Sequence, residues 1–304
     1  MKIGSLCSGY GGLDMAVEAF YGAETAFMCD IDKYASIVIK ERWGVPNLGD
    51  MKQVDYSNVE PVDILTAGYP CQPFSTAGQR KGSADERHLW PYIKEIISHL
   101  RPSRVILENV RGHLTLGFKE VLQDLTEIGY DARWAIVRAS DVGAPHRRER
   151  LFCVAEPTDS NSIRFNFREL GKTRHQGQSQ SESAQCCKAI TNTNDSRGFG
   201  DSQGSSRRLD SRTSTNSNCD EQSRDRQAQR LGSRFNTRDQ MRLQGAPNPL
   251  ELNKLNPKFV EYMMGLPVGW VTDLEISRSQ QLKLLGNGVV PQQAYYAIDK
   301  LERL

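Results

Sequence analysis

The pattern of apolar and polar residues changes twice along the chain. Residues 1–156 alternate short apolar runs with amphipathic stretches, and residues 157–254 are polar almost throughout. Apolar periodicity then returns over residues 255–304. Because only the outer stretches carry enough apolar side chains to form a core, we expect three parts. These are a first domain at 1–156, a variable region at 157–254, and a C-terminal part at 255–304 that completes the first domain.

Six apolar runs predict β-strands, and helical spacing of apolar residues predicts helices between and after them. The expected strands are Lys2–Cys7, Glu24–Cys29, Asp63–Ala67, Arg104–Leu107, Trp134–Val137 and Leu151–Ala155. The expected helices run through Met15–Phe20, from about Lys33, and over Tyr92–Leu100, Phe118–Ile128, Phe259–Met264 and Pro291–Leu301. This alternation is typical of an α/β fold with a doubly wound, mostly parallel sheet, here joined to a small, irregular second region.

The polar stretch carries the basic charge of the chain. Residues 157–249 contain no Val, Trp or Tyr, and hold 15 Lys and Arg against 10 Asp and Glu, a net of +5. The rest of the chain holds 24 against 27, a net of −3. Such a segment could contact phosphates, or it could be a solvated insert, and charge alone favours neither reading. Its composition predicts that most of it is disordered or loosely folded when alone.

The overall composition indicates a soluble protein with reduced thiols. The 304 residues are 38% hydrophobic and 25% charged, with a formal net charge of only +2. None of the seven cysteines shows Cys-x-x-Cys spacing, and Cys186 and Cys187 are adjacent, which suits neither a metal site nor an ordinary disulfide. There is no signal-peptide pattern and no run of about 18 apolar residues. We therefore expect a cytoplasmic protein without a metal or a membrane span.

A glycine-rich turn follows the first expected strand. Ser8-Gly9-Tyr10-Gly11-Gly12 would let a nucleotide approach the backbone at the end of a parallel sheet, although a simple tight turn explains it about as well. Asp30, at the end of the second strand, is placed to accept hydrogen bonds from ribose hydroxyls. Asp50 could reach an adenine edge. Asp14 and Asp32 are expected to face solvent or to cap helices.

A loop cysteine follows the third expected strand. Cys71 lies in Gly68–Ser75, where Pro70 and Gln72 flank it. Loops at the carboxyl ends of parallel strands often carry catalytic residues, and a thiolate there would be a nucleophile. The alternative is a buried structural cysteine. That reading suits the other strand cysteines better, namely Cys7, Cys29 and Cys153.

Two further motifs carry groups that could move protons or bind anions. Glu108 emerges from an apolar strand, so partial desolvation should raise its pKa and make it a plausible proton donor, with a structural ion pair as the alternative. The run Pro145–Arg150 holds His146 and three arginines, which could bind a phosphate or a base carbonyl. A solvated surface turn is the alternative there.

The order of these motifs resembles that of the DNA cytosine-C5 methyltransferases. The matching runs are Ser8–Leu13, Pro70–Ser75, Glu108–Val110, Arg147–Phe152 and Gly286–Pro291. The resemblance covers residues 1–156 and 255–304. It implies a Rossmann-like methyltransferase fold, with a catalytic and S-adenosylmethionine-binding domain at 1–156. It also implies a target-recognition region at 157–254, where the family's motif just before Leu255 is not recognisable.

The resemblance implies roles for individual residues. Cys71 would attack C6 of a cytosine flipped out of the duplex, Glu108 would protonate N3, Arg150 would hold the base carbonyl, and Arg148 would support the site. The implied contacts to S-adenosylmethionine come from the glycine turn, the second strand end and the last motif. They are Cys7, Ser8, Gly9, Tyr10, Gly11, Gly12, Leu13, Asp30, Ile31, Asp50, Met51, Pro70, Asn287 and Val289. The helix after Asn287 is expected to pack back beside the first strand.

The resemblance also implies double-stranded DNA as the partner. The loop Ser75–Arg87 would close over DNA, and the expected contacts are Gln72, Ser75, Arg80, Lys81 and Arg87. We expect a monomer in the cytoplasm of a bacterial or phage-infected cell, with a cognate restriction endonuclease as a partner in function only. Two alternatives stay open. One is a tRNA cytosine-C5 methyltransferase, against which the absence of a Cys-Phe-Thr motif speaks. The other is a non-catalytic nucleic-acid-binding relative.

Overall fold

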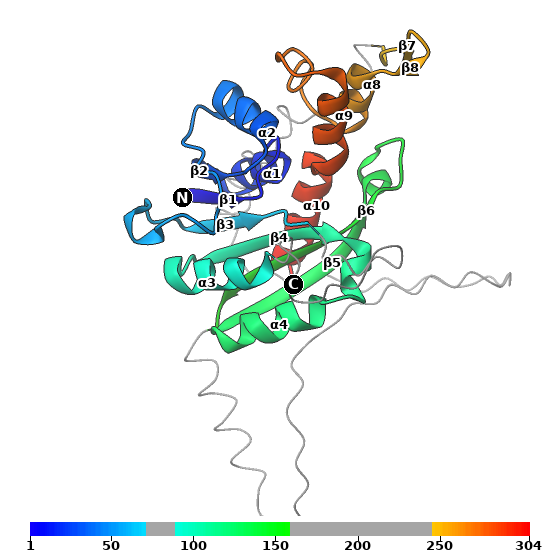
Figure 1. The fold of residues 1–304 in the computed structure, drawn as a ribbon. Coiled ribbons are helices and arrows are strands. Elements are labelled where there is room, and N and C mark those ends of the chain that lie inside the picture. Colours follow the sequence, from blue (N-terminus) through cyan, green and yellow to red (C-terminus); the bar gives the residue numbers. More distant parts are fainter. Residues whose placement is uncertain (71–88, 159–244) are drawn as a thin grey trace, which may run out of the picture. The chain divides into compact units, whose positions relative to one another are not determined.

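The structure, a computed structural model, describes residues 1–70, 89–158 and 245–304 (Figure 1). All of them belong to one unit of the chain. The expected nucleophile Cys71 and the expected closing loop lie outside the described residues, as does nearly all of the polar stretch. The division into three parts therefore stays a prediction. Within the described parts of the chain, no helix is both long and apolar enough to cross a bilayer.

A six-stranded sheet with the order β2-β1-β3-β4-β6-β5 forms the centre of the fold (Figure 1). Its strands are β1 (Lys2–Leu6), β2 (Glu24–Cys29), β3 (Ile64–Ala67), β4 (Arg104–Val110), β5 (Tyr130–Arg138) and β6 (Glu149–Pro157). Strands β1 to β4 are parallel to one another, and β6 is antiparallel to both β4 and β5. The expected mostly parallel sheet is thus confirmed. The segment 139–148 between β5 and β6 is too short for a crossover, so these two strands pair as a hairpin.

Helices cover both faces of the sheet, with α1 (Gly12–Tyr21) and α10 (Pro291–Glu302) on one face and α3 (Trp90–Leu100) and α4 (Phe118–Glu127) on the other (Figure 1). The other helices are α2 (Lys33–Val38), α8 (Pro257–Met263) and α9 (Arg278–Asn287), and α9 packs against the other two. A π-helical turn, Ile39–Trp43, continues α2. Short 3-10 turns lie at Tyr56–Asn58, Arg111–Leu114 and Ala139–Val142. A small hairpin of β7 (Leu250–Glu251) and β8 (Lys254–Leu255) precedes α8.

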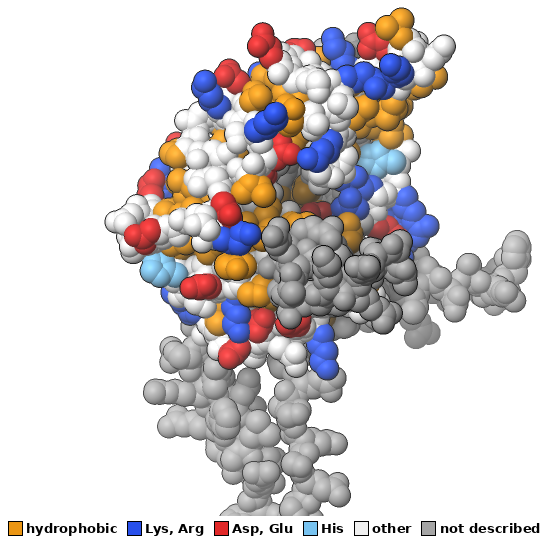
Figure 2. All heavy atoms as spheres, viewed as in Figure 1, with side chains coloured by type: hydrophobic (Ala, Val, Ile, Leu, Met, Phe, Trp, Pro, Cys, Tyr) orange, Lys and Arg blue, Asp and Glu red, His pale blue; other side chains and the backbone are white. Residues whose placement is uncertain are grey.

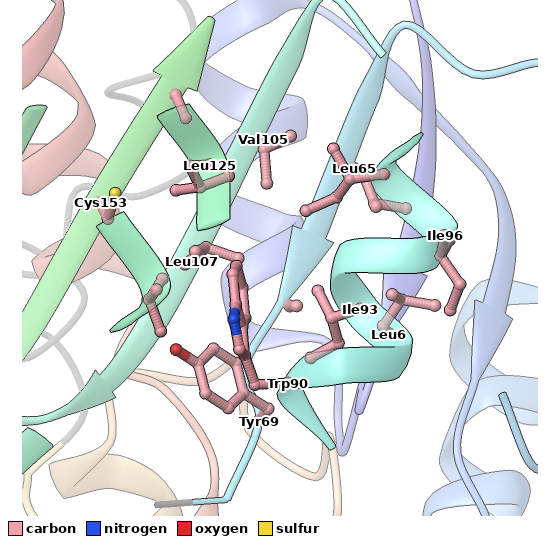
Figure 3. Close-up of a cluster of buried hydrophobic side chains, with 14 of the residues drawn as sticks. Leu6, Leu65, Tyr69, Trp90, Ile93, Ile96, Val105, Leu107, Leu125 and Cys153 are labelled. Carbon is pink, nitrogen blue, oxygen red and sulfur yellow. The ribbon is translucent and has the colours of Figure 1, made fainter. Parts of the chain in front are cut away.

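Alternation of side chains along the strands divides the core into two clusters. Val105 and Leu107 of β4 pack in the cluster under α3 and α4, whereas Ile106 between them packs with α1 and α10. Figure 3 shows the first cluster, in which Trp90 from α3 lies against Tyr69, with ring centroids 5.9 Å apart. The sheet is thus buried on both faces, which leaves its strand ends as the place for a site.

Two details differ from the sequence-based expectations, and one agrees with them. Asp14 neither faces solvent nor caps a helix, because its side chain is 1% exposed beneath the first turn of α1. Asp32 does cap α2 and accepts from the N–H groups of Tyr34 and Ala35, as expected. The terminal helix α10 packs mainly on α1, β5 and β6 rather than beside β1, although Ile3 of β1 belongs to the same cluster.

Candidate active site

A cavity of about 520 Å³ opens where the carboxyl ends of β1, β2, β3 and β4 meet. Its lining combines the turn after β1, the ends of β2 and β3, the end of β4 and the last motif. The lining includes most of the sequence-predicted residues that the structure describes. These are Cys7, Ser8, Gly9, Gly12, Leu13, Asp30, Ile31, Asp50, Met51, Pro70, Glu108, Arg150, Asn287 and Val289. The volume is within the range of small-molecule sites.

The turn after β1 has the left-handed backbone that its residues permit. Cys7, Gly9 and Gly11 have positive φ angles of 55°, 58° and 83°. The N–H of Gly9 donates to the carboxylate of Asp30 at 2.8 Å, so the end of β2 holds the turn in place. Cys7 lies just past β1 instead of inside it. It is half-buried in the cavity wall, and burial raises the pKa of its thiol.

Two residues of the turn do not line the cavity. The side chain of Tyr10 is fully buried, and its hydroxyl donates to the carbonyl of Val289 at 2.6 Å. The backbone of Tyr10 in turn accepts from the indole N–H groups of Trp43 and Trp270. Gly11 is packed against the Trp43 ring, which a Cβ there would overlap. Tyr10 and Gly11 therefore join the first turn to the rest of the fold, and neither faces the ligand space.

The end of β2 supplies a polar group and an apolar rim. Burial raises the pKa of Asp30, whose two carboxylate oxygens already accept from the N–H groups of Gly9 and Asp32. Each oxygen keeps a further lone pair for a hydroxyl. Ile31 follows with a side chain 78% exposed at the cavity rim. Asp50 is half-buried, and Met51 is buried beside it. An apolar side chain left open at a rim is available to pack against a flat ligand ring.

The last motif closes the opposite wall of the cavity. Asn287 ends α9 as an exposed residue, and Val289 is buried against the first turn. Neither Gly12 nor Gly288 could carry a Cβ here, because it would overlap the Val289 carbonyl or the Tyr10 ring respectively. Two segments nearly 280 residues apart in the chain thus form one tightly packed wall.

Glu108 and Arg150 form an ion pair in the cavity wall. The Arg150 Nε lies 3.0 Å from the Glu108 carboxylate, and their side chains are 16% and 9% exposed. Burial raises the pKa of Glu108 to about 7, although the charges of Arg150 and Arg148 pull it down. The raised pKa of Glu108 agrees with the expectation from the sequence. Glu108 lies inside β4 rather than at its end, and antiparallel pairing sets Val110 opposite Arg150.

Arg148 acts on the last motif and does not line the cavity. Its guanidinium donates to the carbonyls of Gly286 and Gly288 at 3.0 and 2.6 Å. Its backbone has a positive φ of 30°, and burial lowers the pKa of its side chain. Its own carbonyl accepts from the buried Gln293 amide of α10. Arg148 therefore fixes the wall that contains Asn287 relative to β6.

Three residues without a sequence-predicted role hold the chain that leads to Cys71. The Asn109 amide donates to the Tyr69 carbonyl at 3.0 Å, and the Tyr69 hydroxyl lies 2.9 Å from His113 Nε2. All three side chains are buried. The Glu-Asn pair in the sequence could have suggested this role for Asn109, but no pattern identifies His113. Together they fix the backbone immediately before Pro70 and Cys71.

A second buried acid lies beneath the first turn. Asp14 accepts from the hydroxyls of Ser5 on β1 and Thr66 on β3, at 3.0 and 2.6 Å. Burial raises its pKa to about 6, against the effect of those hydrogen bonds. Asp14 thus joins α1 to the two strands that carry the glycine turn and the Cys71 loop. Its spacing in the sequence gives no sign of this.

The remaining predicted contacts lie outside the described residues. They are Cys71, Gln72, Ser75, Arg80, Lys81 and Arg87. The described cysteines, Cys7, Cys29 and Cys153, are free thiols, and burial raises the pKa of each. Among the residues that the structure describes, no group of three His, Cys, Asp or Glu side chains is arranged to hold a metal.

The sheet order, the helices on both faces and the cavity at the strand ends are those of a Rossmann-like methyltransferase fold. A model of the C-5 cytosine-specific DNA methylase family matches residues 1–303, so the chain belongs to that family. The crystal structure of S. pombe Dnmt2 methyltransferase has the same fold, with a TM-score of 0.58 and 15% sequence identity. The match covers 100% of this chain and 98% of the S. pombe chain.

Curated relatives match the chain at higher identity over a shorter stretch. Type II methyltransferase M.NgoBI from Neisseria gonorrhoeae is 37% identical over 169 residues, which cover 54% of this chain and 52% of that protein. Type II methyltransferase M.HhaI from Haemophilus parahaemolyticus is 35% identical over 167 residues, covering 53% and 51%. The chain therefore spans about half the length of the curated relatives that it matches.

Proposed function

We propose that the protein transfers a methyl group from S-adenosylmethionine to C5 of a cytosine flipped out of double-stranded DNA. The observation that carries the proposal is the Glu108–Arg150 pair, buried in the wall of the same cavity as the glycine turn and Pro70. A carboxyl group with a pKa near 7 can give up and regain a proton at neutral pH, which cytosine chemistry at N3 requires. Membership of the cytosine methylase family supports the same substrate base.

The cavity fits S-adenosylmethionine in its polar and apolar groups. Asp30 offers lone pairs for ribose hydroxyls, Ile31 offers an apolar surface for the adenine, and Asp50 offers a carboxylate for the adenine amine. Asn287 and the backbone of Gly9 face the same space. When bound, the cofactor supplies a methyl group on a sulfonium sulfur, which makes it open to nucleophilic attack.

The chain's own residues would prepare the cytosine. The Cys71 thiolate adds to C6 and forms a C–S bond while Glu108 gives its proton to N3, so the electron pair of the C5–C6 double bond becomes available at C5. After C5 gains the methyl group, a base removes the C5 proton. The C–S bond then breaks, the thiolate leaves, and the N3 proton returns to Glu108. Arg150 holds the base carbonyl, as its place beside Glu108 permits.

Further parts of the proposal concern the DNA contacts and the division of the chain. Gln72, Ser75, Arg80, Lys81 and Arg87 would contact DNA as the loop closes, and residues 157–254 would select the target. Residues 1–156 and 255–304 would together form the catalytic domain. The protein would act as a monomer in the cytoplasm, with any cognate restriction endonuclease a partner in function only.

A trapping experiment tests the proposal. A duplex carrying 5-fluorocytosine should form a covalent complex with the full chain in the presence of S-adenosylmethionine, because fluorine cannot leave C5 as a proton does. Bisulfite sequencing of DNA from expressing cells supplies the modified sequence to place in that duplex. The Cys71→Ser variant should retain cofactor binding and form no adduct. Methylation by that variant, or modification of tRNA alone, would contradict the proposal.

A further inference from the structure

Three arginines converge on one glutamate at the start of β6. The Glu149 carboxylate lies 2.8 Å from Arg111 Nη1, 3.0 Å from Arg138 Nε and 2.9 Å from Arg147 Nη2. The glutamate side chain is 14% exposed, whereas the arginine side chains are 62%, 49% and 67% exposed. Hydrogen bonds from the arginines lower the pKa of Glu149 to about 2, so it keeps its charge. One carboxylate therefore orients three cations that still face solvent.

We name Glu149 and these three arginines the Glu149 cluster, and it holds more arginines than are needed to balance the charge of one carboxylate. One arginine would neutralise Glu149, and exposed ion pairs contribute little to stability. Each guanidinium has five N–H donors, of which the glutamate uses one or two. The nearby acid Asp141 accepts from the backbone N–H of Arg138 and reduces the excess charge by one. A surplus of oriented, partly unused cationic donors remains.

The cluster lies at the same ends of the strands as the cavity. Arg111 directly follows Val110, the last residue of β4, and Arg138 ends β5. Val110 lines the cavity together with Arg150, the neighbour of Glu149 in β6. Alternation along β6 directs Glu149 to the opposite face of the sheet from Arg150. Figure 2 shows Lys and Arg side chains gathered over this end of β6.

We propose that the Glu149 cluster binds backbone phosphates of the DNA strand whose base enters the cavity. The inference rests on the proposed function, because a base in the cavity must come from a strand whose phosphates lie at its mouth. Guanidinium groups suit phosphate oxygens in geometry and charge, and such contacts position a duplex without reading its sequence. Glu149 keeps the three side chains extended toward the strand before it arrives, which lowers the entropic cost of binding.

The test is the salt dependence of DNA binding by the full chain, measured by fluorescence anisotropy on a labelled DNA duplex of about 20 base pairs. Each arginine that contacts a phosphate contributes about 0.9 to the slope of log affinity against log salt. Between 50 and 200 mM salt, the affinity of the Arg147→Gln variant should therefore fall by a factor about 3.5-fold smaller than that of the wild type. For the double variant with Arg111→Gln, the factor should be about tenfold smaller. Arg147→Lys should restore the slope. The matched control is Arg303→Gln, since Arg303 is an exposed arginine paired with Asp299 at the end of α10.

The outcomes separate this inference from the proposed function. An unchanged slope in the double variant, with thermal melting showing that it is folded, would overturn the role of the cluster even if the protein methylates DNA. A reduced slope in a protein that forms no 5-fluorocytosine adduct would support the cluster and reject the proposed reaction. The role of the cluster would also be overturned if the double variant had a reduced salt slope for an RNA duplex but not for a DNA duplex. It would likewise be overturned if the wild-type chain did not bind DNA.

Discussion

The guanidinium of Arg150 lies 3.0 Å from the carboxylate of Glu108, and the two side chains are buried together on neighbouring antiparallel strands. Burial raises the pKa of Glu108 while Arg150 lowers it, and the balance is a pKa of about 7. The pair therefore leaves the acid poised between its two states at neutral pH. An arginine that formed only a strong structural pair would hold the carboxyl group ionised.

The first prediction concerns the pH profile of methyl transfer. Glu108 must carry its proton to give it to N3, so the single-turnover rate should fall as the pH rises through about 7. Arg150→Gln removes a charge that lowers the pKa of Glu108, so this alkaline limb should move to higher pH while the rate falls throughout. Glu108→Gln should lower the rate by about 10²–10⁴ and abolish the limb. An alkaline limb that is identical in wild type and Arg150→Gln would show that Glu108 is not its origin.

The second prediction assigns a positioning role to Asn109. Asn109→Ala removes the side-chain amide that donates to the Tyr69 carbonyl at 3.0 Å, and the loss of a hydrogen bond of this kind costs about 0.5–1.5 kcal/mol. Because this backbone leads directly into Pro70 and Cys71, trapping of 5-fluorocytosine should slow by about tenfold or more. The dissociation constant for S-adenosylmethionine should stay within about twofold, as measured by calorimetry.

A matched substitution separates this role from general stability. Asn58→Ala also removes an amide hydrogen bond, to Asp55 at 2.7 Å, but at an exposed 3-10 turn away from the cavity. It should leave the trapping rate unchanged. If both variants trapped the base at the wild-type rate, the link between Asn109 and the nucleophile loop would be refuted.

The sequence predicts the parallel sheet and the cavity well because each depends on local patterns. Apolar runs place β1 to β4, and because these strands are parallel, Asp30 after β2 and Glu108 near the end of β4 line the same cavity through topology alone. The β5–β6 pairing is antiparallel because its connection is short, which loop length could have shown.

What the sequence does not predict depends on contacts between distant segments. Asp14 has the spacing of an exposed helical residue, yet hydroxyls on two strands accommodate it in the interior. Glu261 of α8 is buried because the N–H groups of Gly269, Val271 and Thr272 turn toward it. The three arginines of the Glu149 cluster come from separate elements, so no single motif contains them.

The third prediction uses the raised pKa of Asp14. A carboxyl group that is harder to ionise in the folded state destabilises that state as the pH rises through the interval from its unfolded pKa of 3.8 to about 6. Each pKa unit corresponds to about 1.4 kcal/mol, so the loss by pH 7 is on the order of 3 kcal/mol. Asp14→Asn does not titrate. Its stability relative to wild type should therefore improve by up to that amount between pH 4 and pH 7.

Urea unfolding at a series of pH values measures this difference. Wild type and Asp14→Asn should unfold with equal m values, so that only the midpoint changes. Asp32→Asn offers a contrast, because hydrogen bonds from Lys283 and from the first turn of α2 lower the pKa of Asp32 despite its partial burial. That variant should become relatively less stable as the pH rises. A parallel trend in both variants would contradict the burial argument.

The fourth prediction compares two glycines of the last motif. A Cβ at Gly288 would overlap the ring of Tyr10, whereas a Cβ at Gly286 meets no atom within 4 Å. Gly288 has an ordinary φ of −76°, so its requirement for glycine comes from space and not from backbone conformation. Gly288→Ala should lower stability by about 1–3 kcal/mol, the usual cost of overpacking a buried site. It should also weaken cofactor binding, since Tyr10 and Val289 form the wall between the turn and Asn287.

Gly286→Ala lies in α9 and should be neutral or slightly stabilising, because alanine favours a helix. Thermal melting and S-adenosylmethionine calorimetry on both variants check these effects together. Equal melting temperatures for the two alanine variants would show that the wall yields to accommodate a methyl group, and the tight contact between the first and last motifs would then not be what fixes the cofactor site.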